Sequence, residues 1–462
     1  MPSFLKVVSL IALNFAFSGI SYAHNPIVTH TYAADPSARV FNGRIYIYPS
    51  HDRNDAQRYD MNDYHCYSSD DMVNWTDHGV ILNLEQVPWA KPKSYLWAPD
   101  CIYKDGTYYL YFPSPAKEGK SRIGVATSTS PSGPFTPRET FIGGPQGIDP
   151  GVFLDDDRQA YLYWAGAGCQ AAKLKPNMTE LDGEPVKIGG LSNFFEGPAL
   201  FKRNGNYYLT YPAVRPGGSG RGGNGQNYDY AMGKSPLGPF QYKGSFSTSE
   251  LGGNIHGSVI ELGGKWYCFY HDYSTSVGQL KAGFKRALRV DEMTFNADGT
   301  IQPLVWTTSG PPKLKNLDPF ARVEAETLYQ TDFPQGPHAI SVEKCSEGGA
   351  NVGSLENGDW LSYANVDFGA GARELMARVA APVAGAKIEW RLDSLSGPII
   401  GISEVPATGG WQTWVDVRCP VTLAKGVRDL YVKVVGGEGG ELVNLNYFQF
   451  QPKTPADPLQ SP

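Results

Sequence analysis

Three acidic residues and one histidine occupy matching places in the first two thirds of the chain. Asp35, Asp149, Glu196 and His256 each stand about a dozen residues ahead of an aromatic pair, found at 46–48, 161–163, 207–209 and 266–267. Trp97 holds the same position ahead of the YYLYF run, with an aromatic side chain in place of the acid. If the repeated units surround an axis, their leading residues point at one place.

Carboxyl groups that lie close together are the minimum that hydrolysis of a glycosidic bond requires. One must be protonated to assist the leaving oxygen, and another must be ionised to activate water or to attack carbon. Three acids in one pocket raise the pKa of at least one of them by charge repulsion, which supplies a proton donor at neutral pH. The pattern therefore predicts a hydrolytic site formed by Asp35, Asp149 and Glu196.

The elements that must position these residues are short strands. The aromatic runs alternate with period two, and the tyrosines at 46, 109, 161, 208 and 267 lie 47 to 63 residues apart. Such intervals suit propeller blades of four strands, and five units predict a five-bladed β-propeller over 24–305. Two nearly identical turns, SPSGPF at 130–135 and SPLGPF at 235–240, support the repeat. We expect the aromatic pairs, and Trp75, to pack the sheets.

Length and composition fit an all-β protein of two domains. The chain has 462 residues, 53 glycines and 35 prolines, with a net charge of −6 and interspersed charges. This charge distribution gives no reason to expect a nucleic-acid or membrane partner, and we expect a monomer. Residues 1–23 carry a lysine, a short apolar run and Ser21-Tyr22-Ala23, which predicts a signal peptide and a secreted or periplasmic protein.

The six cysteines have long, irregular spacings and form no CxxC pair. Cys101, Cys169 and Cys268 lie in or beside strand-like runs. We therefore expect buried free thiols rather than a disulfide framework or a zinc site.

A different organisation begins near residue 306. A proline-rich linker over 306–320 leads to alternating stretches over 321–452 that predict a β-sandwich, of jelly-roll type, followed by a disordered tail at 453–462. The polar loop at 51–65 and the glycine-rich loop at 215–226 are expected at the rim of the first domain.

The first domain resembles family 43 glycoside hydrolases. The resemblance rests on ADPSARVFNGRIYIYPSHD, WAPD at 97–100, GIDPGVF at 147–153, FFEGPALF and IHGSVIELGGKWYCFYH. It implies an inverting enzyme with Asp35 as general base, Glu196 as general acid and Asp149 as the residue that orients the acid and tunes its pKa. It also implies that His256 faces an axial cation, usually calcium, and that Arg286 helps to hold the sugar.

The residues by themselves leave some of these roles open. Pro follows Asp35 and Asp149, which predicts an extended backbone at both acids, whereas Gly-Pro after Glu196 allows a bend. His256 could instead be a hydrogen-bonded core histidine, and Arg286 could instead close the domain through an ion pair. We expect Trp97 to contact the sugar.

The second domain resembles family 6 carbohydrate-binding modules through VEAE at 323–326, ENGDWLSYANVDFG, PATGGWQTW and VNLNYF. By this likeness Glu324 and Glu326 hold a structural calcium, and their i, i+2 spacing suits one face of a strand. Trp411 would stack on a sugar that Asn444 hydrogen-bonds. Ser354 stands where the family often has an aromatic residue, which weakens the expected glycan binding.

Together these features predict a secreted, inverting exo-glycosidase that acts on xylosidic or arabinofuranosidic bonds of plant polysaccharides such as xylan and arabinoxylan. We expect a β-xylosidase, with calcium and no organic cofactor. An endo-arabinanase and a non-catalytic glycan-binding protein are the alternatives.

Overall fold

The computed structural model describes residues 24–56, 58–214, 226–248, 254–273, 285–332, 334, 338–437 and 439–453. These residues form an all-β protein whose helical content is one 3-10 turn, η1 (Leu84–Gln86), so the predicted all-β class is confirmed. The predicted signal peptide, residues 215–225 of the glycine-rich loop and residues 454–462 of the tail lie outside the described residues. Among the residues described, none forms a helix that could cross a membrane.

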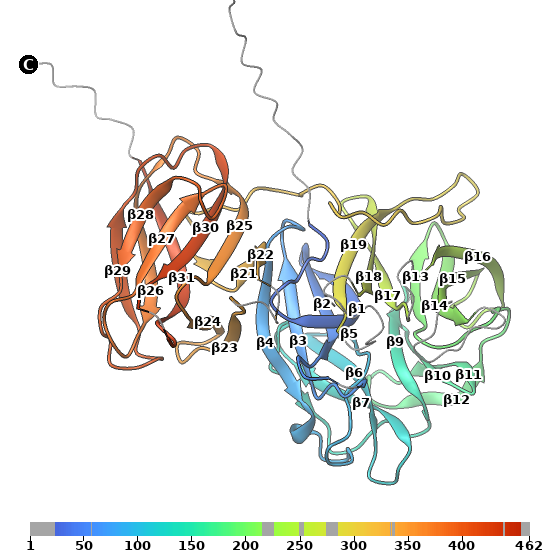
Figure 1. Cartoon of the computed structure of the whole chain (residues 1–462). Helices are drawn as coiled ribbons and strands as arrows, with labels where there is room; N and C mark the ends of the chain where they lie inside the picture. Colours follow the sequence, from blue (N-terminus) through green and yellow to red (C-terminus); the bar gives the residue numbers. More distant parts are fainter. Residues whose placement is uncertain are drawn as a thin grey trace, which may run out of the picture.

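Five antiparallel sheets follow one another along the first part of the described chain (blue to yellow in Figure 1). Their strands are β1 (Tyr32–Phe41), β2 (Arg44–Asp52), β3 (Asp63–Ser69) and β4 (Trp75–Asn83); β5 (Asp100–Lys104), β6 (Thr107–Pro115), β7 (Ser121–Ser128) and β8 (Thr136–Pro137); β9 (Ile148–Leu154), β10 (Ala160–Gly166), β11 (Gly168–Leu174) and β12 (Leu181–Lys187); β13 (Ala199–Arg203), β14 (Asn206–Val214), β15 (Gln226–Gly233) and β16 (Phe240–Thr248); β17 (Gly257–Leu262), β18 (Lys265–Asp272) and β19 (Ala287–Met293).

The aromatic runs form the second strand of each sheet, as the repeat predicted. Tyr111, Tyr208 and Tyr267 are at most 1% exposed, and Trp75 is equally buried, so these rings pack the sheets. The two similar turns have equivalent partners, because the Tyr48 hydroxyl donates to the Pro131 carbonyl (2.6 Å) and the Tyr163 hydroxyl to that of Pro236 (2.5 Å). In both cases a tyrosine of one sheet fixes the turn of the next, which explains why the turn sequence recurs.

The first strands of the five sheets form a ring of contacts. β1 contacts β5, β5 contacts β9, β9 contacts β13, β13 contacts β17, and β17 returns to β1. No hydrogen-bonded sheet of the described residues closes on itself, so the number of propeller blades stays a prediction. Because the leading residues stand in or just before these strands, the ring brings them toward one another.

The second part is a sandwich of two antiparallel sheets (orange and red in Figure 1). One sheet contains β20 (Val323–Glu324), β23 (Ser341–Lys344), β24 (Ala350–Leu355), β26 (Ala372–Ala380), β29 (Val415–Pro420) and β31 (Val443–Pro452). The other contains β22 (Gln330–Thr331), β25 (Trp360–Asp367), β27 (Lys387–Leu392), β28 (Ile399–Glu404) and β30 (Val427–Val435). Trp390, Phe448 and Phe450 lie in the apolar core that joins the two sheets. The β-sandwich prediction is confirmed.

The two parts share hydrogen bonds that the sequence did not reveal. Strand β21 (Thr327–Leu328) lies within the range predicted for the sandwich, yet it pairs with β4 and extends the first sheet. The Asn74 side chain also makes two bonds with the backbone of Ala364, from Nδ2 to the carbonyl (3.0 Å) and from the amide to Oδ1 (2.8 Å). The sandwich is therefore docked on the first sheet, which also carries Asp35.

All six cysteines are free and buried, as predicted. Burial raises the pKa of the thiols, for Cys169 and Cys268 among others, so these side chains are packing residues.

Candidate active site

The predicted acids and the histidine meet at the first strands of the ring. Asp35 lies at a register shift in β1, Asp149 is the second residue of β9, and Glu196 and His256 just precede β13 and β17. His256 Nδ1 is 3.6 Å from Asp35 Oδ1, and Asp149 Oδ2 accepts from the amide of Gly197 at 3.2 Å. The structure thus brings together four side chains that are up to 221 residues apart in the sequence.

The backbone at two of the acids differs from our prediction. Asp35 and Asp149 have φ of 50° and 53°, in the left-handed region, and not the extended conformation expected before proline. A following proline disfavours the right-handed helical region, and aspartate is one of the few residues that tolerate the left-handed one. Such conformations concentrate at functional sites, and here the one at Asp35 lets its amide donate to His271 Nδ1 at 3.0 Å.

The glycine after Glu196 has a definite steric role. Gly197 has φ of 56°, and a β-carbon there would lie 2.7 Å from His256 Nε2. The bend predicted for Gly-Pro is present, and it lets the chain pass close to the histidine while the Gly197 amide holds Asp149.

Asp35 is held as a carboxylate. Burial of this carboxyl opposes ionisation, but the charge of Arg286 and the hydrogen bond with His256 outweigh burial and hold the pKa of Asp35 well below its usual range. Arg286 Nη1 lies 2.8 Å from Asp35 Oδ1, and the Ser50 hydroxyl donates to Oδ2 at 2.7 Å. An ionised, firmly oriented carboxylate is what a general base requires.

Glu196 and Asp149 are shifted in the opposite direction. Burial and the negative charge of Asp149 raise the pKa of Glu196 to about 8, while burial raises the pKa of Asp149 to about 6. The two groups titrate as a pair, and Glu196, which has the higher pKa, keeps its proton to a higher pH than Asp149. At neutral pH the site therefore contains a protonated acid beside an ionised base, the two states that glycoside hydrolysis needs.

Three residues that support Asp35 were missed by the sequence analysis. Asp52 binds Arg286 through both oxygens, at 2.9 Å from Nε and 2.8 Å from Nη2, and Ser50 and His271 contact Asp35 directly. Burial and the nearby Arg286 lower the pKa of His271 to about 3, so its imidazole is neutral. The signal was present in the sequence, because Ser50 and Asp52 alternate at the end of an aromatic strand.

Arg286 and Trp97 lie at the same site with different environments. Arg286 is 1% exposed, paired with Asp35 and Asp52, and its guanidinium lies 5.1 Å from the ring centre of Tyr59. Trp97 is half-buried, stacks on Tyr95 and donates from Nε1 to the Tyr59 carbonyl at 2.9 Å. Tyr59 belongs to the loop at 51–65, so this loop does reach the acids. Sugar contacts by Trp97 and Arg286 stay predictions.

The surroundings of His256 do not fit a calcium site built from protein oxygens. Calcium takes six to eight oxygen ligands. A narrow cavity at the first strands is lined by His256, Asp35 and Asp100, among others. The Asp35 carboxylate is already paired with Arg286, and Asp100 accepts from Ser37, Arg39 and the Val152 amide. An axial cation would take its remaining ligands from water, and its presence stays a prediction.

The predicted sugar-binding residues of the sandwich lie together. Trp411 is half-buried, and its carbonyl accepts from Asn444 Nδ2 at 3.0 Å. Asn444 is 2% exposed, and its amide also bonds Glu343 Oε1 (2.7 Å) and the Ser354 backbone (3.0 Å). The observed role of Asn444 is thus to hold the loop of Trp411, and a bond to sugar stays a prediction.

The predicted calcium residues of the sandwich are separated by secondary structure. β20 ends at Glu324, and Glu326 stands in the turn before β21, so the two do not share one face of a strand as expected. Glu324 pairs with Arg322. Glu326 is 4% exposed, its Oε2 has no hydrogen-bond partner among the described residues, and burial raises the pKa of its carboxyl well above the usual range. An unpartnered buried carboxylate oxygen fits a ligand of a bound cation.

Comparison with known proteins assigns the chain to a family. Residues 23–301 match the pattern described as glycosyl hydrolases family 43, and residues 334–452 match carbohydrate binding module family 6. The chain belongs to glycosyl hydrolase family 43. It is a glycoside hydrolase with a family 6 module, in agreement with the resemblance found in the sequence.

Several relatives extend over both parts of this family 43 enzyme. An arabinoxylan arabinofuranohydrolase of Bacillus subtilis (strain 168) is 35% identical over 92% of this chain and 92% of its own, and one of Paenibacillus polymyxa is 33% identical over 98% and 78%. A crystal structure of a family 43 arabinoxylan arabinofuranohydrolase from Bacillus subtilis, in complex with cellotetraose, superposes with a TM-score of 0.83 at 34% identity, covering 93% of this chain and 98% of the other.

Proposed function

We propose that this enzyme removes terminal arabinofuranose from arabinoxylan by inverting hydrolysis. The observation that carries the proposal is the separation of the carboxyl pKa values: Asp35 is held far below its usual range, whereas the pKa of Glu196 is raised to about 8. Two carboxyl groups in opposite protonation states are the requirement for acid and base catalysis at one bond.

The steps follow from these states. Glu196 donates its proton to the glycosidic oxygen as the bond to the sugar breaks, and Asp35 removes a proton from the water that attacks the anomeric carbon from the opposite face. Asp149 keeps the proton on Glu196 by charge repulsion and, through the Gly197 amide, fixes the backbone next to the acid. Arg286 keeps Asp35 ionised between turnovers.

We favour arabinofuranose over xylose as the released sugar because of the relatives whose similarity extends over both parts of this chain. The relatives that match both parts of this chain are named arabinoxylan arabinofuranohydrolases. The β-xylosidase expected from the sequence remains the second candidate. It is favoured by a Humicola insolens xylosidase/arabinosidase, 38% identical over 60% of this chain and 98% of its own. Membership of the family argues against the non-catalytic alternative, and an endo-arabinanase would require an open groove.

The proposal extends to the number of propeller blades, the cellular location, the bound calcium and the oligomeric state. The ring of contacts from β1 to β17 supports five blades, and residues 1–23 support export to the periplasm or the medium. The unpartnered oxygen of Glu326 supports a calcium ion in the sandwich, whose ligands would include Glu326. We expect the enzyme to act as a monomer.

A substrate panel tests the proposal. The wild type should release arabinose from wheat arabinoxylan and from p-nitrophenyl α-L-arabinofuranoside faster than xylose from p-nitrophenyl β-D-xyloside, and should leave debranched arabinan intact. Preferential release of xylose would replace the proposed activity with that of a β-xylosidase. Cleavage of debranched arabinan to oligosaccharides would support the endo-arabinanase instead.

A further inference from the structure

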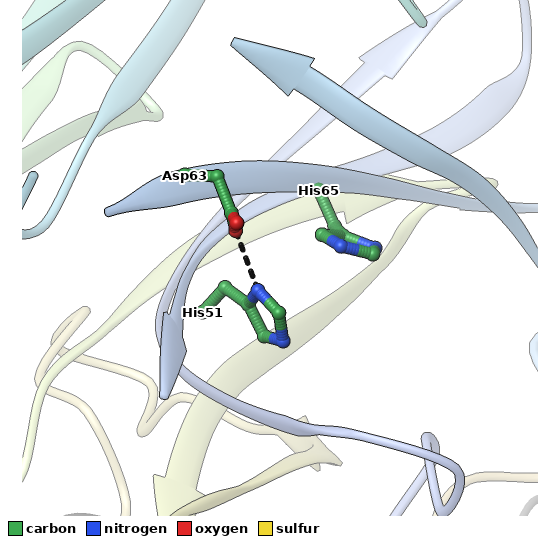
Figure 2. A group of neighbouring side chains, drawn as sticks. All are labelled: His51, Asp63 and His65. Carbon is green, nitrogen blue, oxygen red and sulfur yellow. Dashed lines mark hydrogen bonds and ion pairs between the residues drawn. The ribbon is translucent and has the colours of Figure 1, made fainter. Parts of the chain in front are cut away.

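A cluster of three side chains of the types that bind metals lies outside the catalytic site. One ring nitrogen of His51, one of His65 and a carboxylate oxygen of Asp63 all lie within 4.8 Å of one another. Figure 2 shows the three side chains facing a common space between β2, which carries His51, and β3, which carries Asp63 and His65. We propose that this cluster is a binding site for a divalent transition metal such as Zn²⁺.

The orientation of both imidazoles supports a metal site. A histidine that binds a metal usually donates its other N–H to an oxygen, which fixes the tautomer and the ring. His65 Nδ1 lies 2.9 Å from Asp77 Oδ1, which leaves Nε2 for the metal. His51 Nε2 lies 2.9 Å from the Thr31 hydroxyl, which leaves Nδ1. Each histidine therefore already has the outer partner that a metal ligand needs.

The third ligand stands next to the free nitrogen of His51. Asp63 Oδ1 is 2.5 Å from His51 Nδ1, so the two atoms share a proton in the absence of metal. Binding of Zn²⁺ releases that proton, and the oxygen and the nitrogen move apart to the wider spacing of two ligands on one ion. His51 and Asp63 are partly exposed, which gives a metal and a water ligand access from solvent.

The ligand atoms of this cluster favour one class of metal ion. Two imidazoles and one carboxylate suit Zn²⁺, Co²⁺ or Ni²⁺, whereas Ca²⁺ and Mg²⁺ prefer oxygen ligands. The site also has a structural consequence. His51 is adjacent to Asp52, which holds Arg286 against Asp35, and the His65 partner Asp77 also binds His30 at 2.8 Å. A metal would therefore tie β2 to β3 beside the support of the catalytic base.

Titration of the full chain with metal tests the proposal. The protein is stripped with chelator, calcium is kept in excess to fill oxygen sites, and Zn²⁺ is added in a calorimeter. We expect one equivalent to bind and the melting temperature to rise. Co²⁺ should give the intense visible absorption of a site with nitrogen ligands and low coordination number. Absence of saturable binding by the wild type would overturn the proposal.

Variants locate the ion. His51→Gln and His65→Gln should each remove the binding, and Thr31→Val, which deletes only the outer partner of His51, should weaken it about 10-fold. His78→Gln is the matched control. His78 lies on β4 of the same sheet and bonds Ser68 at 2.7 Å, outside the cluster, so its loss should leave the affinity unchanged. If His65→Gln does not fold, the partly exposed His51 provides the decisive variant. Full affinity in His51→Gln would place the metal elsewhere and refute the site.

Discussion

Arg286 binds Asp35 and Asp52 at the same time. Its Nη1 lies 2.8 Å from Asp35 Oδ1, and its Nη2 lies 2.8 Å from Asp52 Oδ1. Because Arg286 is 1% exposed, its charge acts on Asp35 with little screening by water. The charge state of the proposed catalytic base thus depends on an arginine that a second aspartate holds in place.

Replacement of this arginine should shift the acid limb of the pH profile. Arg286→Lys keeps the charge but loses the planar fork that spans two carboxylates. The pKa of Asp35 then rises toward its ordinary value. Since the base must be ionised, kcat/KM should begin to fall at a higher pH than in the wild type, with the loss growing as the pH decreases. The measurement is kcat/KM against pH.

Arg289→Lys is the matched control for this change. Arg289 is also buried and is the third residue of β19, but its carboxylate partner is Asp272. Its substitution should lower stability without moving the acid limb. An unchanged limb in Arg286→Lys, or an equal shift in Arg289→Lys, would argue that the contacts of the Arg286 fork with Asp35 and Asp52 do not control the pKa of Asp35.

Asp149 should control the alkaline limb. Activity requires a protonated Glu196, so kcat/KM of the wild type should fall as the pH rises through about 8. The charge of Asp149 contributes to this raised pKa. Asp149→Asn removes that charge, so Glu196 should lose its proton at lower pH and the alkaline limb should move toward neutrality. A limb that stays in place or moves to higher pH would contradict the assignment.

The proton donor can be identified from the leaving group. Glu196→Gln keeps the size of the side chain but cannot donate its proton to the leaving oxygen. Hydrolysis of arabinoxylan, whose leaving alcohol needs protonation, should fall by about 10²- to 10⁴-fold. Hydrolysis of a p-nitrophenyl arabinofuranoside, whose leaving group is acidic, should fall much less. Asp35→Asn should instead lose activity on both substrates to a similar degree, and equal losses in Glu196→Gln would remove Glu196 from the donor role.

Calcium should change the pH dependence of stability through Glu326. The pKa of this carboxyl is raised in the folded protein, mainly by burial, so in chelator the folded state holds a proton that the unfolded state has lost. The contribution of Glu326 to stability should therefore be complete below the ordinary pKa of glutamate and should be lost as the pH rises above it toward the raised pKa. Calcium should restore it by pairing the ionised carboxylate.

Melting temperatures with chelator and with calcium measure this effect. Glu326→Gln should show no stabilisation by calcium, whereas Glu374→Gln, which removes an exposed partner of Arg418, should respond as the wild type does. A calcium response of normal size in Glu326→Gln would show that the ion, if it binds, uses other ligands.

The sequence was informative where local pattern determines structure. The spacing of the aromatic runs located the second strand of each of the five sheets, and the acids that lead them do meet, because alternation and turn residues are local properties. The partners of Asp35 were harder to find. His271 contacts Asp35 from β18, and Asp52 acts on it through Arg286; the alternation of Ser50 and Asp52 marks one face of β2 but does not by itself name Asp35 as the residue they support.

The backbone conformation at the acids and the contacts between the domains could also not be predicted from the sequence pattern. Proline after Asp35 and Asp149 disfavours the right-handed helical region of φ and ψ but leaves both the extended and the left-handed regions. Hydrogen bonds such as that from the Asp35 amide to His271 decide between these two regions. Strand β21 is two residues long and pairs with β4 of the other domain, so no periodicity could have assigned it.

The anomeric form of the first sugar released tests the catalytic assignment most directly. Proton NMR during the first minutes of hydrolysis of an α-L-arabinofuranoside, or of a β-D-xyloside if that is the better substrate, distinguishes the two outcomes before mutarotation mixes them. With Asp35 as the base that activates water, the first product should have the opposite configuration, β-arabinofuranose or α-xylose. Initial release of α-arabinofuranose or β-xylose would mean retention, and would contradict the roles given to Asp35 and Glu196.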